Sequence, residues 1–196
     1  MERVSSRDGT TQWELARAGD ESAFGAIFDA HRDRVFRHAY RFVADRHDAE
    51  DVLATTFLEL WRRRDTVGLV DGSVLPWLLV TASNTALSSR RARQRYQKLL
   101  GRIPHDEALP SAEEEAFARQ ETLDSRLREA LHRLRDIDRG LVALVMLEGY
   151  PTAEAAAALG ITPGTARTRL SRVRTRLRLE LSPTSAPALP TEEASS

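Results

Sequence analysis

The stretch of sequence that decides the fold is Thr152-Ala153-Glu154-Ala155-Ala156-Ala157-Ala158-Leu159-Gly160-Ile161-Thr162-Pro163-Gly164-Thr165-Ala166. Its alanine-rich first half predicts a short helix that can approach a neighbouring helix closely. Gly160 suits the left-handed residue that ends such a helix. Thr162 then caps a new helix, with Pro163 at its first position. Two helices joined by so sharp a turn form a helix-turn-helix, in which a supporting helix precedes a recognition helix.

The helix expected after this turn has one apolar face and one basic face. At about 100° per residue, its inward positions are Ala166, Leu170, Val173 and Leu177. Its outward positions are Arg167, Thr168, Ser171, Arg172, Thr175 and Arg178, flanked by Arg169, Arg174 and Arg176. A recognition helix presents its N-terminal residues to base edges and leaves flanking cations for phosphates. The candidate DNA-binding residues are therefore Arg167, Thr168, Ser171 and Arg172, with Arg169 beside them.

A solvated arginine-rich helix, or one lying on an acidic surface, would have the same basic face. For an isolated basic helix, that interpretation is the favoured one. The turn over 159–164 changes the balance, because turn chemistry and helical periodicity agree. Together they favour DNA binding, and guanine is a suitable target because an arginine fork can pair with two of its major-groove acceptors.

The charge of this 196-residue chain is concentrated in patches, although its formal total is zero. Basic residues cluster over 90–98 and 167–178, whereas 106–121 is acidic. Local basic patches are the electrostatic footprint of nucleic-acid binding. The absence of cysteine excludes disulfides and cysteine metal ligands. No apolar run approaches the ~20 residues of a membrane span, and the N-terminus lacks the apolar core of a signal peptide. We therefore expect a cytoplasmic protein without membrane insertion.

Helical periodicity recurs along the chain while strand signals are scarce, which predicts an all-α fold of two small domains joined by a linker. Helices are expected to begin near Asp20, at Asp48 and near Pro76, and Asp138 is expected to cap a helix that Gly149 closes. The predicted segments are a flexible N-terminus (1–12), a first domain (13–95), a linker (96–120), a second domain containing the helix-turn-helix (121–181) and a disordered tail (182–196).

An enzymatic function is disfavoured by what the sequence lacks. The five histidines show no metal-ligand spacing, and neither a nucleophile elbow nor a phosphate-binding glycine loop is present. His31 and His38 lie seven residues apart on one helix face and are interpreted as residues at the edge of the core. We expect no catalytic residue, no metal and no cofactor.

Three stretches resemble a known family when they are taken in order. They are Asp48-Ala49-Glu50-Asp51-Val52 with Thr56-Phe57-Leu58-Glu59-Leu60-Trp61; Pro76-Trp77-Leu78 with Asn84-Thr85-Ala86 and Arg90-Arg91; and Glu148-Gly149-Tyr150 with Leu159-Gly160 and Gly164-Thr165-Ala166-Arg167-Thr168-Arg169-Leu170-Ser171-Arg172. In this order and spacing they resemble the sigma-70 family of RNA polymerase sigma factors, extracytoplasmic function (ECF) class. The resemblance covers about residues 13–181.

The resemblance implies a role for each stretch. The first resembles the helix that binds the polymerase clamp, with Asp48, Glu50, Asp51, Val52, Phe57, Leu58 and Trp61 as candidate contacts. The second resembles the helix that reads and melts the minus-10 element, with candidates Asn84, Trp77, Arg90 and Arg91, and with Asp71, Gly72 and Ser73 in a loop that accepts a flipped base. The third resembles the minus-35 reader. Trp77 has two open interpretations, base stacking or, as is commoner at helical spacing, core packing.

By the same resemblance, the partners are core RNA polymerase, through its clamp and its flap, promoter DNA and an anti-sigma factor. The acidic part of the linker is either a mimic of nucleic acid inside the polymerase or a solvated charge run. The resemblance implies an alternative sigma factor that directs promoter recognition, DNA melting and transcription initiation. A helix-turn-helix regulator that does not bind polymerase as a sigma subunit remains the alternative.

Overall fold

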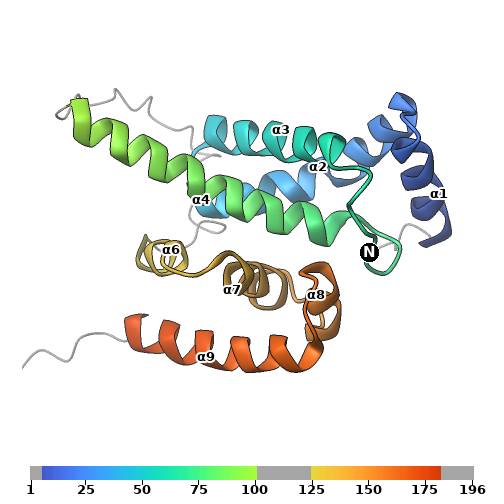
Figure 1. Cartoon of the computed structure of the whole chain (residues 1–196). Coiled ribbons are helices and arrows are strands. Elements are labelled where there is room, and N and C mark those ends of the chain that lie inside the picture. Colours follow the sequence, from blue (N-terminus) through green and yellow to red (C-terminus); the bar gives the residue numbers. More distant parts are fainter. Residues whose placement is uncertain (1–5, 101–124, 182–196) are drawn as a thin grey trace, which may run out of the picture.

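The computed structural model describes residues 6–100 and 125–181, with side chains over 9–88 and 125–181. The predicted tail and most of the predicted linker lie outside these residues. Within the described part, every regular element is a helix, and the one β-bridge joins Val70 to Ser73. The helices form two layers, in which the N-terminal helices lie against the C-terminal ones (Figure 1). The predicted all-α fold with two small domains is confirmed.

The N-terminal domain consists of α1 (Ser6–Arg17), α2 (Glu21–Val43), α3 (Arg46–Arg62) and α4 (Leu75–Leu100). The sequence predicted a flexible segment over 1–12, but the structure has a helix from Ser6 onward. This helix is anchored because Trp13 and Ala16 are buried in the domain core. At the other end, α4 continues beyond residue 95, where the sequence placed the domain boundary.

The starts of α2 and α3 show how local capping sets helix boundaries. Asp20 caps α2 as predicted, since its carboxylate accepts a hydrogen bond from the Ala23 amide at 2.9 Å. The prediction that Asp48 begins the next helix was wrong. Asp45 is the cap, and its carboxylate accepts from the Asp48 amide at 2.8 Å, so α3 begins at Arg46. Asp48 thus lies in the first turn, where a negative charge is favoured by the helix dipole.

The C-terminal domain consists of α6 (Ser125–His132), α7 (Asp136–Leu141), η1 (Val142–Leu147), α8 (Thr152–Ala158) and α9 (Pro163–Leu181). The helix predicted from Arg139 to Glu148 instead begins at Asp136 and widens into a π-helical segment, η1. The cap prediction for Asp138 was also wrong, because the cap position is Arg135 and carries no side-chain hydrogen bond. Gly149 ends the segment in a left-handed conformation, as predicted (φ +73°).

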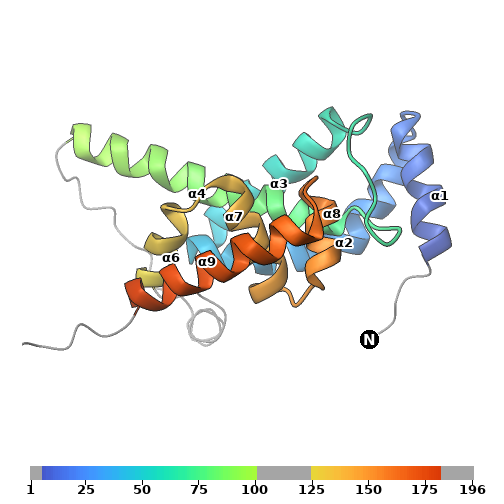
Figure 2. The same ribbon diagram turned by 60° about the horizontal axis from the view of Figure 1, so that its bottom comes forward.

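The two domains pack against each other along α4. Helices α7 and α8 and the segment η1 all contact α4, and α7 lies between α4 and α9 (Figure 2). Gly140 of α7 is at the closest point, since a Cβ there would be 3.4 Å from Val80 Cγ1 of α4 and only 2.6 Å from Leu159 Cδ2. A glycine at this position therefore lets α7 approach its neighbours.

Candidate nucleic-acid interface

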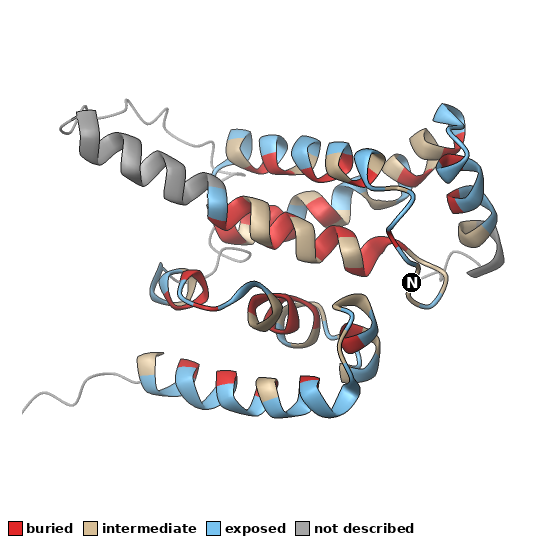
Figure 3. Cartoon of the chain, viewed as in Figure 1, coloured by how far each residue is buried: buried red, intermediate tan, exposed pale blue. Residues whose placement is uncertain are grey.

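The recognition helix α9 has the face structure that its sequence predicts. Its buried residues are Ala166, Leu170, Val173 and Leu177. The opposite side of the helix is a continuous exposed strip (Figure 3). Thr162 holds the start of the helix, because its hydroxyl accepts a hydrogen bond from the Thr165 amide at 3.2 Å. The preceding Gly160 is left-handed (φ +65°), so the predicted helix-turn-helix is confirmed in its turn and in its orientation.

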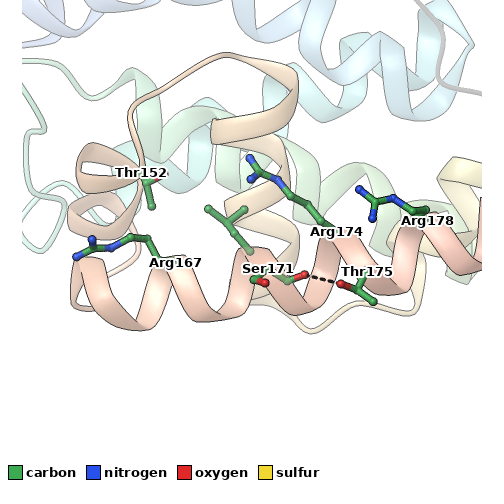
Figure 4. Close-up of a pocket in the computed structure, with 7 residues that line it drawn as sticks. Thr152, Arg167, Ser171, Arg174, Thr175 and Arg178 are labelled. Atoms are coloured by element: carbon green, nitrogen blue, oxygen red, sulfur yellow. Dashed lines mark hydrogen bonds between the residues drawn. The ribbon is translucent and has the colours of Figure 1, made fainter.

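The candidate base readers lie on the exposed side of α9. Arg167, Thr168, Ser171 and Arg172 are all exposed and come from its first half. A shallow groove runs along the helix beside them and is lined by Thr152, Arg167, Leu170, Ser171, Arg174, Thr175 and Arg178. In Figure 4 the guanidinium groups of Arg174 and Arg178 project from the same side of the helix. The groove therefore presents cations beside hydroxyl groups, which suits a phosphate backbone next to base edges.

Arg169 is oriented differently from its neighbours. Its Nη1 donates to Asp138 Oδ1 of α7 at 2.9 Å, and both side chains are partly buried. This pair ties the recognition helix to the segment that contacts the N-terminal domain. Arg169 was predicted to bind DNA, and in this structure its guanidinium group is bound to Asp138 instead.

The minus-10 candidates divide into an accessible loop and a covered helix position. Asp71 and Gly72 have positive φ values of 49° and 70°, and the Val70 and Ser73 backbones exchange hydrogen bonds of 3.0 and 3.1 Å. This is a tight two-residue turn, which leaves Asp71 exposed. The Ser73 hydroxyl accepts from the Leu75 amide at 3.1 Å and so holds the start of α4. The loop is therefore a hydrogen-bonded turn that leads directly into α4.

Asn84 is covered by the C-terminal domain. Its Oδ1 accepts a hydrogen bond of 2.8 Å from Arg139 Nη1. Trp77 is half-buried and packs against the domain core, as the core interpretation expects. The remaining candidates in this group, Arg90 and Arg91, belong to α4, but their side chains lie outside the described residues.

The candidate polymerase contacts on α3 fall on two faces. Glu50 and Asp51 are exposed, Asp48 is partly exposed, and the Leu58 side chain is an exposed apolar residue. Val52 and Phe57 are buried in the core, so they position α3 and cannot themselves contact a partner. Trp61 is half-buried, with its ring 5.0 Å from the Phe24 ring, and Arg64 lies over it at 4.4 Å. The outer face of α3 is thus acidic with an apolar centre.

The sequence did not predict the polar cluster between the domains, which centres on Glu148. Its carboxylate accepts from His38 Nδ1 at 2.7 Å, from Arg41 Nη1 at 3.1 Å and from Arg34 Nη2 at 3.3 Å. The three donors come from α2, on the other side of the interface. His38 was expected at the edge of the core, but its side chain is fully buried. Its position seven residues after His31 was the only available signal, and it does not reveal a partner.

The electrostatics of Glu148 reflect competition between burial and its partners. Burial raises the pKa of this carboxyl, whereas the His38 hydrogen bond and the charges of His38, Arg41 and Arg34 lower it. The partners prevail, so the pKa of Glu148 lies below its ordinary value. Glu148 is therefore charged at neutral pH. The side chain of Glu148 is only 8% exposed, so on separation of the domains water would have to replace the hydrogen bonds that its carboxylate now accepts.

Arg139 was also not predicted as a functional residue. It is almost fully buried, and its guanidinium donates to the carbonyl oxygens of Leu131 and Leu134, to Asp136 and to Asn84. A buried guanidinium with this many acceptors orders the start of α7. Its sequence position, as the first residue of the helix expected after the Asp138 cap, gave no sign that its side chain faces another domain.

Comparisons with known proteins follow the same division into two domains. The model of sigma-70 region 2 matches residues 27–96, and that of sigma-70 region 4 matches 124–177. The ECF RNA polymerase sigma factor SigE of Mycolicibacterium smegmatis is 31% identical over 189 residues, covering 86% of this chain and 71% of SigE. The RNA polymerase sigma factor CarQ of Myxococcus xanthus is 33% identical over 171 residues, covering 84% of this chain and 92% of CarQ. The chain belongs to the ECF sigma factors of the sigma-70 family.

The fold of this sigma factor agrees with a solved structure. CnrH, solved in complex with the cytosolic domain of CnrY, is 23% identical and aligns with a TM-score of 0.53 over 88% of this chain and 96% of CnrH. Sigma factors are non-enzymatic components of transcription initiation, which supports the prediction that the chain is not an enzyme. In the described residues, no group of three or more His, Asp or Glu side chains is placed to hold a metal ion. None of the described helices combines the length and the apolar character that a membrane span requires.

Proposed function

We propose that this sigma factor reads the minus-35 element with Arg167, Thr168, Ser171 and Arg172 of α9. The observation that carries this assignment is the exposed basic face of a recognition helix whose apolar face is buried. Entry of α9 into the major groove would place its first half at base edges, while Arg174 and Arg178 in the adjoining groove would face phosphates. Arg169 would join them once its bond to Asp138 is released.

The N-terminal domain would bind core polymerase and open the promoter. The acidic and apolar outer face of α3, with Asp48, Glu50, Asp51 and Leu58, would contact the polymerase clamp. Asn84 and the loop with Asp71, Gly72 and Ser73 would hold unpaired bases of the minus-10 element. The cost of unstacking, a few kcal/mol per flipped base, would be offset by contacts with phosphates and with polymerase.

The remaining partners follow from family membership. The C-terminal domain would contact the polymerase flap, and Arg90 and Arg91 would follow the DNA backbone. An anti-sigma factor that covers the polymerase-binding surfaces is a further proposed partner, and the cytoplasm, where core polymerase acts, is the proposed location. The domain boundaries at 95, 120 and 181, and both roles of the acidic linker, remain predictions.

Run-off transcription tests the proposal directly. Purified chain is added to core polymerase with genomic fragments of its source, and the transcripts are mapped. We expect transcripts that start at a small set of discrete sites sharing upstream elements, and none from core polymerase alone. Core polymerase that binds the chain but starts at no discrete site would contradict the proposal. A chain that binds the fragments but not the polymerase would instead indicate a helix-turn-helix regulator.

A further inference from the structure

We propose that the interface between the two domains is an intramolecular latch that keeps the free chain closed and withholds Asn84 from DNA. The latch consists of Arg34, His38 and Arg41 on α2, Asn84 on α4, and Arg139 and Glu148 of the C-terminal domain. The inference rests on the proposed function, because the role of Asn84 in binding the minus-10 element comes from it.

The first part of the latch is the ion cluster around Glu148. One carboxylate receives hydrogen bonds from three side chains of α2, at 2.7 to 3.3 Å. Arg34 also lies over the Tyr150 ring at 5.8 Å, so it holds the chain on both sides of Gly149. His38 is fixed from its other ring nitrogen, Nε2, by the Ser83 hydroxyl of α4 at 2.8 Å. The carboxylate site is therefore prearranged by two helices of the N-terminal domain.

The second part is the contact between Arg139 and Asn84. Arg139 donates to the Asn84 amide oxygen at 2.8 Å, which occupies the acceptor that Asn84 would offer to an unpaired base. The neighbouring residue Asp138 binds Arg169 of the recognition helix at 2.9 Å. Arg139 and Asp138 are consecutive residues of α7, so two side-chain hydrogen bonds from this helix connect it to the proposed minus-10 residue and to the proposed minus-35 helix.

The geometry of a promoter is incompatible with this closed state. The minus-10 and minus-35 elements, by their names, are about 25 base pairs apart, and at about 3.4 Å per pair this separation is roughly 85 Å. Helix α9 has 19 residues and is about 28 Å long. In the closed chain, Asn84 is in direct hydrogen-bond contact with Arg139 of the C-terminal domain. The closed chain therefore cannot place Asn84 on the minus-10 element and α9 on the minus-35 element at the same time. The domains must separate before both elements are bound.

The composition of the interface makes such separation reversible. Its ionic contacts can be exchanged for contacts with water or with a partner, and interdomain interfaces of this polar kind permit relative domain motion. Arg34 and Arg41 retain side-chain exposures of 39% and 30%, so solvent reaches the cluster from one side. Core polymerase, which must hold the domains apart to place them on DNA, would release the latch.

A reversible disulfide tests the closed state, and the chain suits it because it contains no cysteine. A Cβ at Gly140 would be 3.4 Å from Val80 Cγ1, which is compatible with a bond between Val80→Cys and Gly140→Cys. The flexible end of Leu159 must rotate to make room. We expect the double variant, oxidised before mixing with core polymerase, to lose transcription and to regain it on reduction. The two single-cysteine variants, treated identically, should stay active.

A second variant tests the latch without a new cross-link. Dyes at Ala30→Cys on α2 and Ala157→Cys on α8, both exposed positions, report the separation of the domains by energy transfer. Glu148→Gln keeps the shape but removes the charge, and the loss of charged hydrogen bonds should shift the open-to-closed ratio about tenfold towards the open state. In the free Glu148→Gln chain, affinity for a single-stranded minus-10 oligonucleotide from a mapped promoter should rise as the open state becomes more populated. Affinity for a minus-35 duplex should stay unchanged.

Glu129→Gln is the matched control, because Glu129 of α6 forms an exposed pair at 3.4 Å with Arg133, the first residue after that helix. It should leave the energy transfer unchanged. An oxidised double variant that transcribes as well as the reduced one would overturn the proposal, and so would Glu148→Gln with wild-type energy transfer. If the double variant stays inactive after reduction, the energy transfer of Glu148→Gln relative to wild type decides whether the latch exists. Failure of the proposed function is distinguishable, since wild-type chain would then initiate at no site while energy transfer in the free chain could still be measured.

Discussion

Helices α9 and α4 are both proposed to read DNA, yet the structure presents them in opposite ways. Helix α9 buries four apolar residues and leaves its base-reading side chains exposed. On α4, Asn84 is bound by an arginine from the other domain. The same difference separates two arginines of the C-terminal domain, because Arg172 is exposed and Arg139 is almost fully buried. On the proposed assignments, the duplex-reading side chains are accessible in the free chain, whereas Asn84 would become accessible to the melted element only after domain separation.

The largest expected effect is that of Arg139→Ala on stability. The Leu134 carbonyl oxygen would lose its buried guanidinium donor, at about 1–3 kcal/mol, and the Leu131 carbonyl oxygen would keep only the Leu134 amide. We expect the free energy of unfolding of the C-terminal domain to fall by about 3 kcal/mol, as measured by denaturant titration. Arg135→Ala, which changes an exposed neighbour, should cost less than about 0.5 kcal/mol. Equal effects of the two changes would show that burial of Arg139 does not contribute.

Arg172→Ala should lower DNA affinity and leave stability unchanged, the opposite of Arg139→Ala. Arg172 is exposed on α9, so its loss leaves no buried group unpaired. If it pairs with a guanine, affinity for the cognate minus-35 duplex should fall by about 1–3 kcal/mol, while unfolding and polymerase association stay at wild-type values. Fluorescence anisotropy with duplexes changed at single positions provides the measurement. Arg133→Ala, which changes an exposed arginine just after α6, is the control. Loss of polymerase binding by Arg172→Ala would contradict the assignment of α9 to DNA.

Sequence reasoning succeeded for α9 because every signal for it is local. Gly160, Thr162 and the apolar repeat after them all lie within one helix-turn-helix, and burial confirmed each inward position. It failed for the latch because the partners are distant in sequence. His38 and Glu148 are 110 positions apart, and Asn84 and Arg139 are 55 apart. A polar pair has no periodicity, so neither the buried His38 nor the covered Asn84 could be deduced from its neighbours.

The predictions of helix boundaries failed for a different reason. Asp45 and Asp48 are both good caps, and only the hydrogen bond from the Asp48 amide to Asp45 decides between them. Along α3, the motif that predicts polymerase binding contains residues of both faces. Val52 and Phe57 therefore belong to the core, whereas Leu58 next to them is exposed. A motif marks a helix, and the turn angle of each residue decides which of its members can reach a partner.

Asn84→Ala tests the proposed role of α4. We expect it to weaken promoter opening by about 1 kcal/mol, or roughly fivefold. Promoter opening, followed by permanganate reactivity of unpaired thymines, should fall more than closed-complex formation. The change also removes the acceptor for Arg139 and so loosens the latch. Glu148→Gln loosens the latch but keeps Asn84, and it is therefore the control that should retain opening. Equal loss at both steps for Asn84→Ala would argue against a role in melting.

The smallest expected effect is the pH dependence of the latch. The pKa of Glu148 lies below its ordinary value of 4.5, so its stabilising contribution is complete above pH 4.5 and is lost as pH falls through the lower, folded-state value. The titratable and charged side chains that face it are Arg34, His38 and Arg41 of α2. Tyr150, which is also near Glu148, stays neutral in acid, because burial raises its pKa.

The energy-transfer difference between wild type and Glu148→Gln should therefore be constant from neutral pH down to about pH 5, should begin to shrink below pH 4.5, and should vanish below the lower, folded-state pKa. A protonated glutamic acid is close in shape and charge to glutamine, so the two chains become equivalent once Glu148 is neutral. Circular dichroism at each pH checks that the helices remain folded. If the difference persists in folded protein after Glu148 has been protonated, the carboxylate charge does not hold the domains together, and the closed state would rest on Arg139 and the apolar contact at Gly140 alone.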